Sequence, residues 1–166
     1  MTNPHEAAML ITGLHERFCD ELDELMRSFS AQLPTPDRPE CRLSLKSARW
    51  AGYYWWRPNC CWYSIPHACT VGGDSYTNTV AHEVCHAYAS QLHRGSAWHG
   101  ETWQLLMRHL GHEPQRTVTV DMKLVRKVGN LLWARYRGAA RGSMRQVEDP
   151  LMLKGGSDVN SQSKDR

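Results

Sequence analysis

The sequence predicts an α+β fold, in which a single domain combines a short antiparallel sheet with three main helices. Two patterns carry this prediction. Apolar residues recur every three or four positions near the N-terminus and again after residue 77, and this spacing is typical of helices. Between residues 41 and 70, short aromatic-rich runs separated by turn residues are typical of strands. A chain of 166 residues is long enough to bury one core.

The N-terminal segment carries the signals of a helix start. Asn3 can cap the helix, Pro4 suits the first helical position, and Glu6 can reach back to the cap. Prolines from Pro34 onward end the helix. The apolar residues predicted to form one face of this helix are Leu10, Leu14, Phe18, Leu22, Leu25 and Phe29.

The strand region contains a predicted hairpin. Residues 52–56 and 61–65 are rich in Tyr and Trp, and Arg57-Pro58-Asn59 between them is a turn sequence. Two uses of these aromatic side chains stay open. Packing in the core or in a groove wall is favoured, because alternation along a strand sends half of the residues inward. Stacking on unpaired nucleic-acid bases is the other use.

Residues 82–86 form the motif HExxH within a helix predicted from about Thr77 to His93. Positions i and i+4 share one helix face, so His82 and His86 can converge on one metal ion. Glu83 lies beside the first of them and can accept a proton from a metal-bound water, whose pKa zinc lowers toward neutrality. Core packing is favoured for Cys85, which points about 100° away from the second histidine around the helix.

A catalytic zinc site takes three protein ligands and leaves a fourth position for water. His93 cannot supply the third ligand, because it lies about 10 Å beyond His86 along the helix axis. His99 stands at the start of the next predicted helix, where a chain reversal can bring it over the metal, and Glu101 is a second choice. A closed structural zinc site with a fourth protein ligand is the alternative. The candidate third ligands are His93, His99, Glu101, His109, His112 and Glu113.

Residues 82–88, 98–103 and 107–111 resemble the SprT-like family, whose pattern is HExxH followed by HGxx(F/W) at a helix start. The resemblance covers about residues 5–115. It implies a minigluzincin-like fold and peptide-bond hydrolysis, acting on DNA-associated proteins in some members. It also implies one zinc ion held by three histidines, with Glu83 as the general base. The implied ligands are His82, His86 and His99.

The resemblance suggests three segments along the chain. Residues 1–115 are the expected metallopeptidase core, 116–148 a basic extension and 149–166 a disordered tail rich in Gly, Ser and Asp. Many family members carry a second, zinc-binding ribbon that opens with YxCxxCG. In this chain Gly138 and Arg141 occupy the two cysteine positions, so the extension is either a cysteine-free remnant of that ribbon or a helix, and no second zinc is expected.

The net charge of +3 is unevenly distributed. Residues 1–40 contain three Arg against eight Asp or Glu, whereas residues 108–145 contain nine Lys or Arg against two acidic residues. The basic segment is expected either to contact the phosphates of DNA or to be a solvated helix surface. Besides DNA, the expected partner is a protein or peptide substrate.

The sequence also bears on location. No stretch approaches the roughly 20 apolar residues that span a bilayer, and the N-terminus lacks the pattern of a secretory signal. The six cysteines show no CxxC spacing and are expected to be reduced, mostly buried thiols of a cytoplasmic protein.

The sequence therefore predicts a zinc-dependent metallopeptidase that uses Glu83 to activate a zinc-bound water. The alternative is a nucleic-acid-binding or partner-binding module whose zinc site is structural or vestigial.

Overall fold

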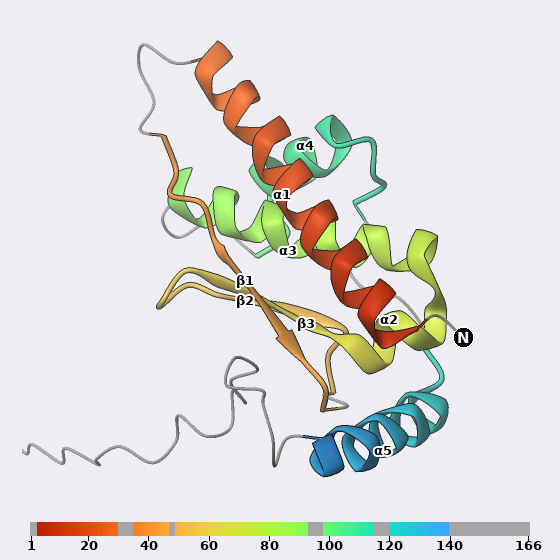
Figure 1. Ribbon diagram of the computed structural model, residues 1–166. Coiled ribbons are helices and arrows are strands. Elements are labelled where there is room, and N and C mark those ends of the chain that lie inside the picture. Colours follow the sequence, from red (N-terminus) through yellow and green to blue (C-terminus); the bar gives the residue numbers. More distant parts are fainter. Residues whose placement is uncertain (1–2, 30–34, 47–48, 93–97, 115–119, 140–166) are drawn as a thin grey trace, which may run out of the picture.

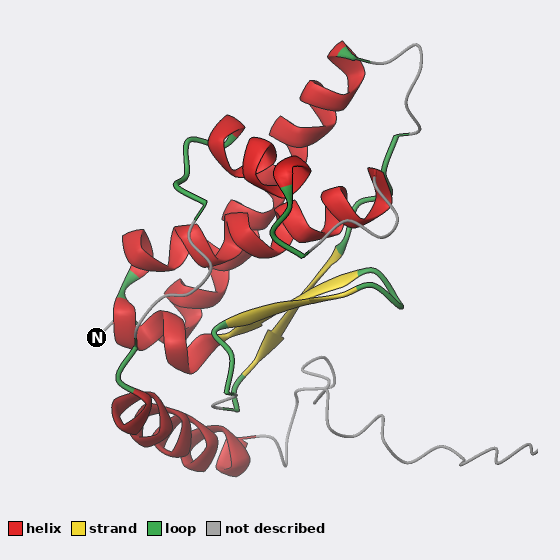
Figure 2. Ribbon diagram, turned by 180° about the vertical axis from the view of Figure 1, so that it is seen from behind, coloured by secondary structure: helices red, strands yellow, loops and turns green. Residues whose placement is uncertain are grey.

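A computed structural model describes residues 3–29, 35–46, 49–92, 98–114 and 120–139. Within these residues the α+β class is confirmed, with α1, α3 and α4 on one side of a three-stranded sheet and α5 against α2 (Figures 1 and 2). The elements are α1 (Pro4–Ser28), β1 (Glu40–Ser44), β2 (Gly52–Trp55), β3 (Cys60–Ser64), α2 (Ile65–Val71), α3 (Gly73–Leu92), α4 (Glu101–His109) and α5 (Met122–Ala139).

Helix α1 begins as predicted, and its buried face overlaps the predicted one at Leu14, Phe18 and Leu22. Asn3 accepts a hydrogen bond from the His5 backbone N–H at 2.9 Å, and the capping box with Glu6 is present. Leu10 and Phe29, at the two ends of the predicted apolar row, are exposed. Successive steps of four residues turn by about 40° around a helix, so such a row leaves the buried face. The buried residues are Ala7, Ile11, Leu14, His15, Phe18, Cys19, Leu22 and Met26.

The sheet is mixed, with the strand order β1-β3-β2. The predicted hairpin is confirmed, because β2 pairs antiparallel with β3 and Tyr54 faces Cys61. The expectation of a wholly antiparallel sheet is wrong, because β1 pairs parallel with β3 and Cys41 also faces Cys61. Strand β1 lies beside β3 rather than beside its sequence neighbour β2, and periodicity within a strand carries no information about that choice.

The aromatic side chains of the hairpin divide between the interior and the surface. Tyr54, Trp62 and Tyr63 are buried, as the core-packing interpretation expects. Trp55 and Trp56 are exposed. Strand β3 is buried at all five positions because it is the central strand.

Helix α2 was not predicted, although its signals are visible in the sequence. Ser64 caps it, Pro66 lies in its first turn, and Gly72 ends it with a φ of +84°, a conformation that favours glycine. Helix α3 follows at once and therefore begins four residues before the predicted Thr77. Its apolar stripe packs as expected, with Val80, Val84, Ala87 and Tyr88 all buried.

Two further predictions concern the C-terminal part of the chain. The helical form of the extension is confirmed for residues 122–139 by α5. The suggested strand near residues 117–120 lies mostly outside the described residues, and the tail at 149–166 lies wholly outside them. The division of the chain into three segments stays a prediction.

The six cysteines are free in the structure. All are buried except Cys41, which is partly buried. Burial raises the pKa of Cys19 and Cys41 to about 12. No described helix combines the length and the apolar character that crossing a bilayer requires.

Candidate metal centre

Helix α3 presents the two histidines of the HExxH motif on one face. The Nε2 atoms of His82 and His86 lie 3.1 Å apart, and the two rings meet edge to face with their centroids 4.7 Å apart. His86 is buried and His82 is partly buried. The one-turn spacing of the motif thus produces the convergence that a shared ligand requires.

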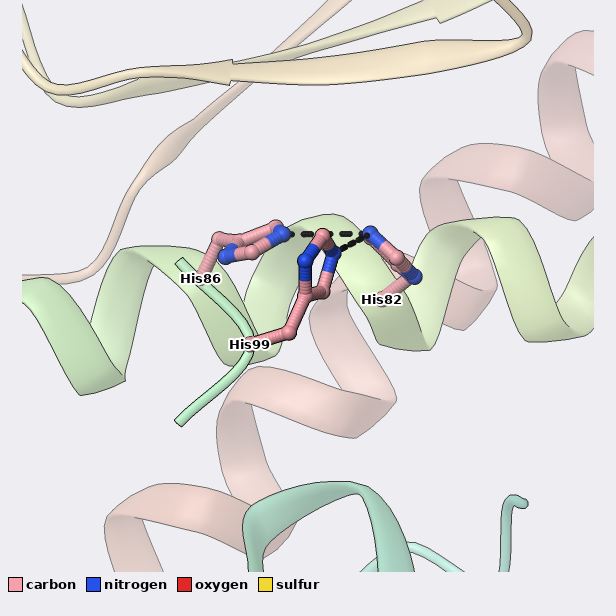
Figure 3. Close-up of side chains that lie close together, drawn as sticks. All are labelled: His82, His86 and His99. Carbon is pink, nitrogen blue, oxygen red and sulfur yellow. Dashed lines mark hydrogen bonds between the residues drawn. The ribbon is translucent and has the colours of Figure 1, made fainter. Parts of the chain in front are cut away.

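His99 reaches the same point from the segment that leads into α4 (Figure 3). Its Nε2 lies 3.2 Å from the Nε2 of His82. Gly100 is the N-cap residue of α4, and the Gln104 side-chain amide donates to the His99 carbonyl at 3.1 Å. The ligand nitrogens of the three histidines all lie within 4.8 Å of one another.

This spacing fits a metal ion better than a hydrogen-bonded cluster. Two nitrogens held at about 2.0–2.1 Å by a tetrahedral ion lie about 3.3 Å apart, close to the observed separations. A neutral imidazole nitrogen either donates or accepts one hydrogen bond, yet the Nε2 of His82 faces two other ring nitrogens. The His82, His86 and His99 group could therefore hold a metal ion.

The protonation of His86 suits a ligand. Burial, followed by the neighbouring charges of His82 and His99, lowers the pKa of His86 to about 3. The ring is therefore neutral at physiological pH and keeps a lone pair. Metal-binding histidines must be in this form.

Trp103 forms the floor beneath the three imidazoles. Its ring centroid lies 4.6 Å from that of His99, 4.8 Å from that of His82 and 5.5 Å from that of His86. Its indole N–H donates to the His82 carbonyl at 3.2 Å, and the side chain is fully buried. Trp103 lies in a motif that the sequence resemblance highlighted, but the motif alone did not reveal its contact with all three rings.

Glu83 lies next to His82 on α3 and is buried. Burial raises the pKa of its carboxyl group to about 8, and a hydrogen bond from the backbone of Tyr54 opposes that rise. The Cys61 thiol donates to the backbone carbonyl of Glu83 at 3.4 Å. A divalent cation nearby would favour the ionised carboxylate, since an opposite charge lowers a carboxyl pKa.

The other candidate ligands lie elsewhere or carry no contact with the cluster. Glu101 is exposed in the first turn of α4, and His109 is exposed at the end of that helix. The ring of His112 packs edge to face against Phe18 at 5.4 Å. His93 lies outside the described residues, and Cys85 is in the core. Among the described residues, no fourth His, Cys, Asp or Glu joins the three histidines.

Trp98 lies beside His86 at the protein surface. It is 65% exposed, and its ring centroid lies 5.6 Å from that of His86. The ring of His86 thus contacts one buried indole, that of Trp103, and one solvent-facing indole.

An HExxH helix and an imidazole from the next helix start, beside a mixed three-stranded sheet, define an α+β protein with an HExxH-type candidate metal centre. The family model described as SprT-like matches residues 16–123, which is more than half of the chain. The chain belongs to the SprT-like family, whose members are generally zinc metallopeptidases. No curated protein and no solved structure matches it significantly.

Proposed function

We propose that this chain is a zinc-dependent metallopeptidase that hydrolyses peptide bonds. The observation that carries the proposal is the convergence of the His82, His86 and His99 ring nitrogens, with the buried Glu83 next to His82 on the same helix. Membership of the SprT-like family supports the same reaction class.

Zinc is the proposed ion because three neutral imidazoles suit it and leave one position of a tetrahedron open. When bound, zinc acts as a Lewis acid and lowers the pKa of water toward neutrality. His82 and His86 fix two ligand positions through the rigidity of α3. His99 adds the third from a separate element, so the complete site exists only when α4 is docked on α3.

Glu83 is the proposed proton acceptor. Its carboxylate would take the proton from the attacking water and deliver it to the leaving amine, as general acid–base catalysis requires. Its buried surroundings keep bulk water from competing for that proton. Trp103 holds the imidazoles in one arrangement by packing against all three rings.

The decisive experiment replaces Glu83 with Gln, which keeps the size of the side chain and removes its basicity. The Glu83→Gln protein should retain stoichiometric zinc and the circular dichroism spectrum of the parent. Its cleavage of a protein substrate, or of the chain itself, should fall by about 10²–10⁴-fold. Glu24→Gln, at an exposed position of α1, is the matched control and should leave cleavage unchanged.

Two results would reject this assignment in favour of a binding module with a structural or vestigial zinc. One is cleavage that is equal in the parent and in the Glu83→Gln protein. The other is a zinc-loaded parent that cleaves neither itself nor any protein offered, with or without DNA.

We also propose that DNA-associated proteins are the substrate class. Helix α5 supports this part of the proposal. It contains no acidic residue, and Lys123, Arg126, Lys127 and Arg135 are all exposed on it. Its other face packs inward and fixes the helix, so the cations stand on a rigid surface facing solvent. Exposed cations on a fixed helix, without acidic residues between them, favour phosphate contacts.

A further inference from the structure

Gly52, the first residue of β2, lies against the candidate active site. A Cβ atom built on Gly52 would lie 2.9 Å from Cγ of Glu83, 3.1 Å from Cγ2 of Thr79 and 3.3 Å from the carbonyl oxygen of Trp62. The first of these distances is shorter than real Cβ contacts. The backbone of Gly52 has no positive φ, so space alone excludes a larger residue.

Glu83 is enclosed by the sheet on this side. Besides the contact with Gly52, the backbone of Tyr54 hydrogen-bonds to the carboxyl group, and the Cys61 thiol donates to the Glu83 carbonyl. Strand β2 is an edge strand, yet it is held by β3 on one side and packs on α3. The carboxyl group therefore sits between a helix and a strand that are both fixed.

We propose that Gly52 is a positioning residue for Glu83, and that the missing side chain at residue 52 sets where the carboxylate stands. A methyl group there would meet three atoms at 3.3 Å or less. The Trp62 carbonyl belongs to the central strand, where a shift would disturb the sheet, and the Thr79 methyl lies farther away than Glu83, at 3.1 Å. Of the three neighbours, Cγ of Glu83 lies nearest, at 2.9 Å, and is the atom that must shift most. The catalytic part of this inference rests on the proposed peptidase function.

The contact can be tested without any assay of catalysis, by a double-mutant cycle on the full chain. Thermal unfolding is measured for the parent, Gly52→Ala, Glu83→Ala and the double variant, all without metal. Gly52→Ala should lower the unfolding midpoint in the parent. The loss should be smaller in the Glu83→Ala background, where the Cγ atom is absent. Gly13→Ala is the matched control, because an added Cβ at Gly13 meets nothing within 4 Å.

If Gly52→Ala lowers the unfolding midpoint equally in the parent and in the Glu83→Ala protein, residue 52 does not act on Glu83. That result would overturn the proposal. If Gly52→Ala alone does not fold, the double variant should fold. Failure of the double variant to fold while Glu83→Ala folds would overturn the proposal equally.

Measurement of kcat tests the positioning role of Gly52. Gly52→Ala should lower kcat by about 10–100-fold, as displacement of a catalytic group does, with KM and zinc affinity unchanged. In a Glu83→Gln background the same substitution should not lower kcat further, because the side chain that it displaces no longer accepts the proton. Normal kcat in Gly52→Ala would refute the role. If the parent shows no peptidase activity, the proposed function fails, whereas the unfolding cycle still decides the contact.

Discussion

His99 is the residue on which the proposed metal centre depends most. It comes from a different element than His82 and His86, and without it the two remaining imidazoles form an ordinary pair on one helix. His99→Ala should weaken zinc binding by at least 100-fold, more than the loss of a residue that only supports a ligand. Competition with a chromogenic chelator measures this change.

His109→Ala is the matched control for that substitution. His109 is exposed at the far end of α4, so removing its ring changes the histidine count without touching the cluster. Equal zinc affinities in the two variants would contradict the three-histidine site.

The candidate site was partly predictable at the level of single residues. The i, i+4 spacing indicated His82 and His86, and a histidine after a chain break indicated His99. The roles of Trp103 and Gly52 were not predictable in the same way. Each depends on a contact between segments far apart in the sequence, here 21 residues from Trp103 to the His82 carbonyl. Periodicity describes one segment at a time and does not contain such contacts.

Among the elements, α5 carries the expectation of nucleic-acid binding. Arg126→Gln combined with Lys127→Gln removes two exposed cations from this helix. If both contact phosphates, the slope of log K against log salt for single-stranded DNA should fall by about 1.4. Fluorescence anisotropy over a salt series measures the slope.

A charge-matched control comes from α1. Arg17→Gln combined with Arg27→Gln removes the same charge from exposed positions on that helix. The α1 pair should leave the slope nearly unchanged. Equal salt slopes for the two double variants would contradict DNA binding by α5. Only net charge would then matter, and α5 would be a solvated surface.

Helices were more predictable than the sheet for a physical reason. The capping residues of α1 and the apolar spacing of α3 act within one or two turns, so local sequence contains them. The parallel pairing of β1 with β3 depends on which strand lies between the other two. Helix α2 is an intermediate case, because Ser64 and Pro66 are ordinary start signals that the strand-like run before them obscured.

For the whole molecule, metal binding should act as a source of stability. The candidate ligands come from α3 and from the segment that leads into α4, so an ion bound by all three should stabilise the folded chain and not the unfolded one. At about 1,000 times its Kd, zinc should add about 4 kcal/mol to the free energy of unfolding. For a chain of this size that corresponds to a rise in Tm of roughly 8–16 °C.

Differential scanning calorimetry with zinc and with a chelator measures this shift. The His99→Ala protein should show little of it at the same zinc concentration. A Tm that does not respond to zinc in the parent would mean that the three histidines do not form a site joining the two helices.

The burial of the core thiols affects how the protein reacts with oxidants. Thiolate is the form that oxidants and alkylating agents attack, and burial disfavours it at Cys19, Cys61 and Cys85. The native chain is therefore shielded from peroxide at these positions, and damage there must follow an opening of the interior rather than cause it. Any factor that keeps α1, α3 and the sheet together also protects the sulfur atoms between them.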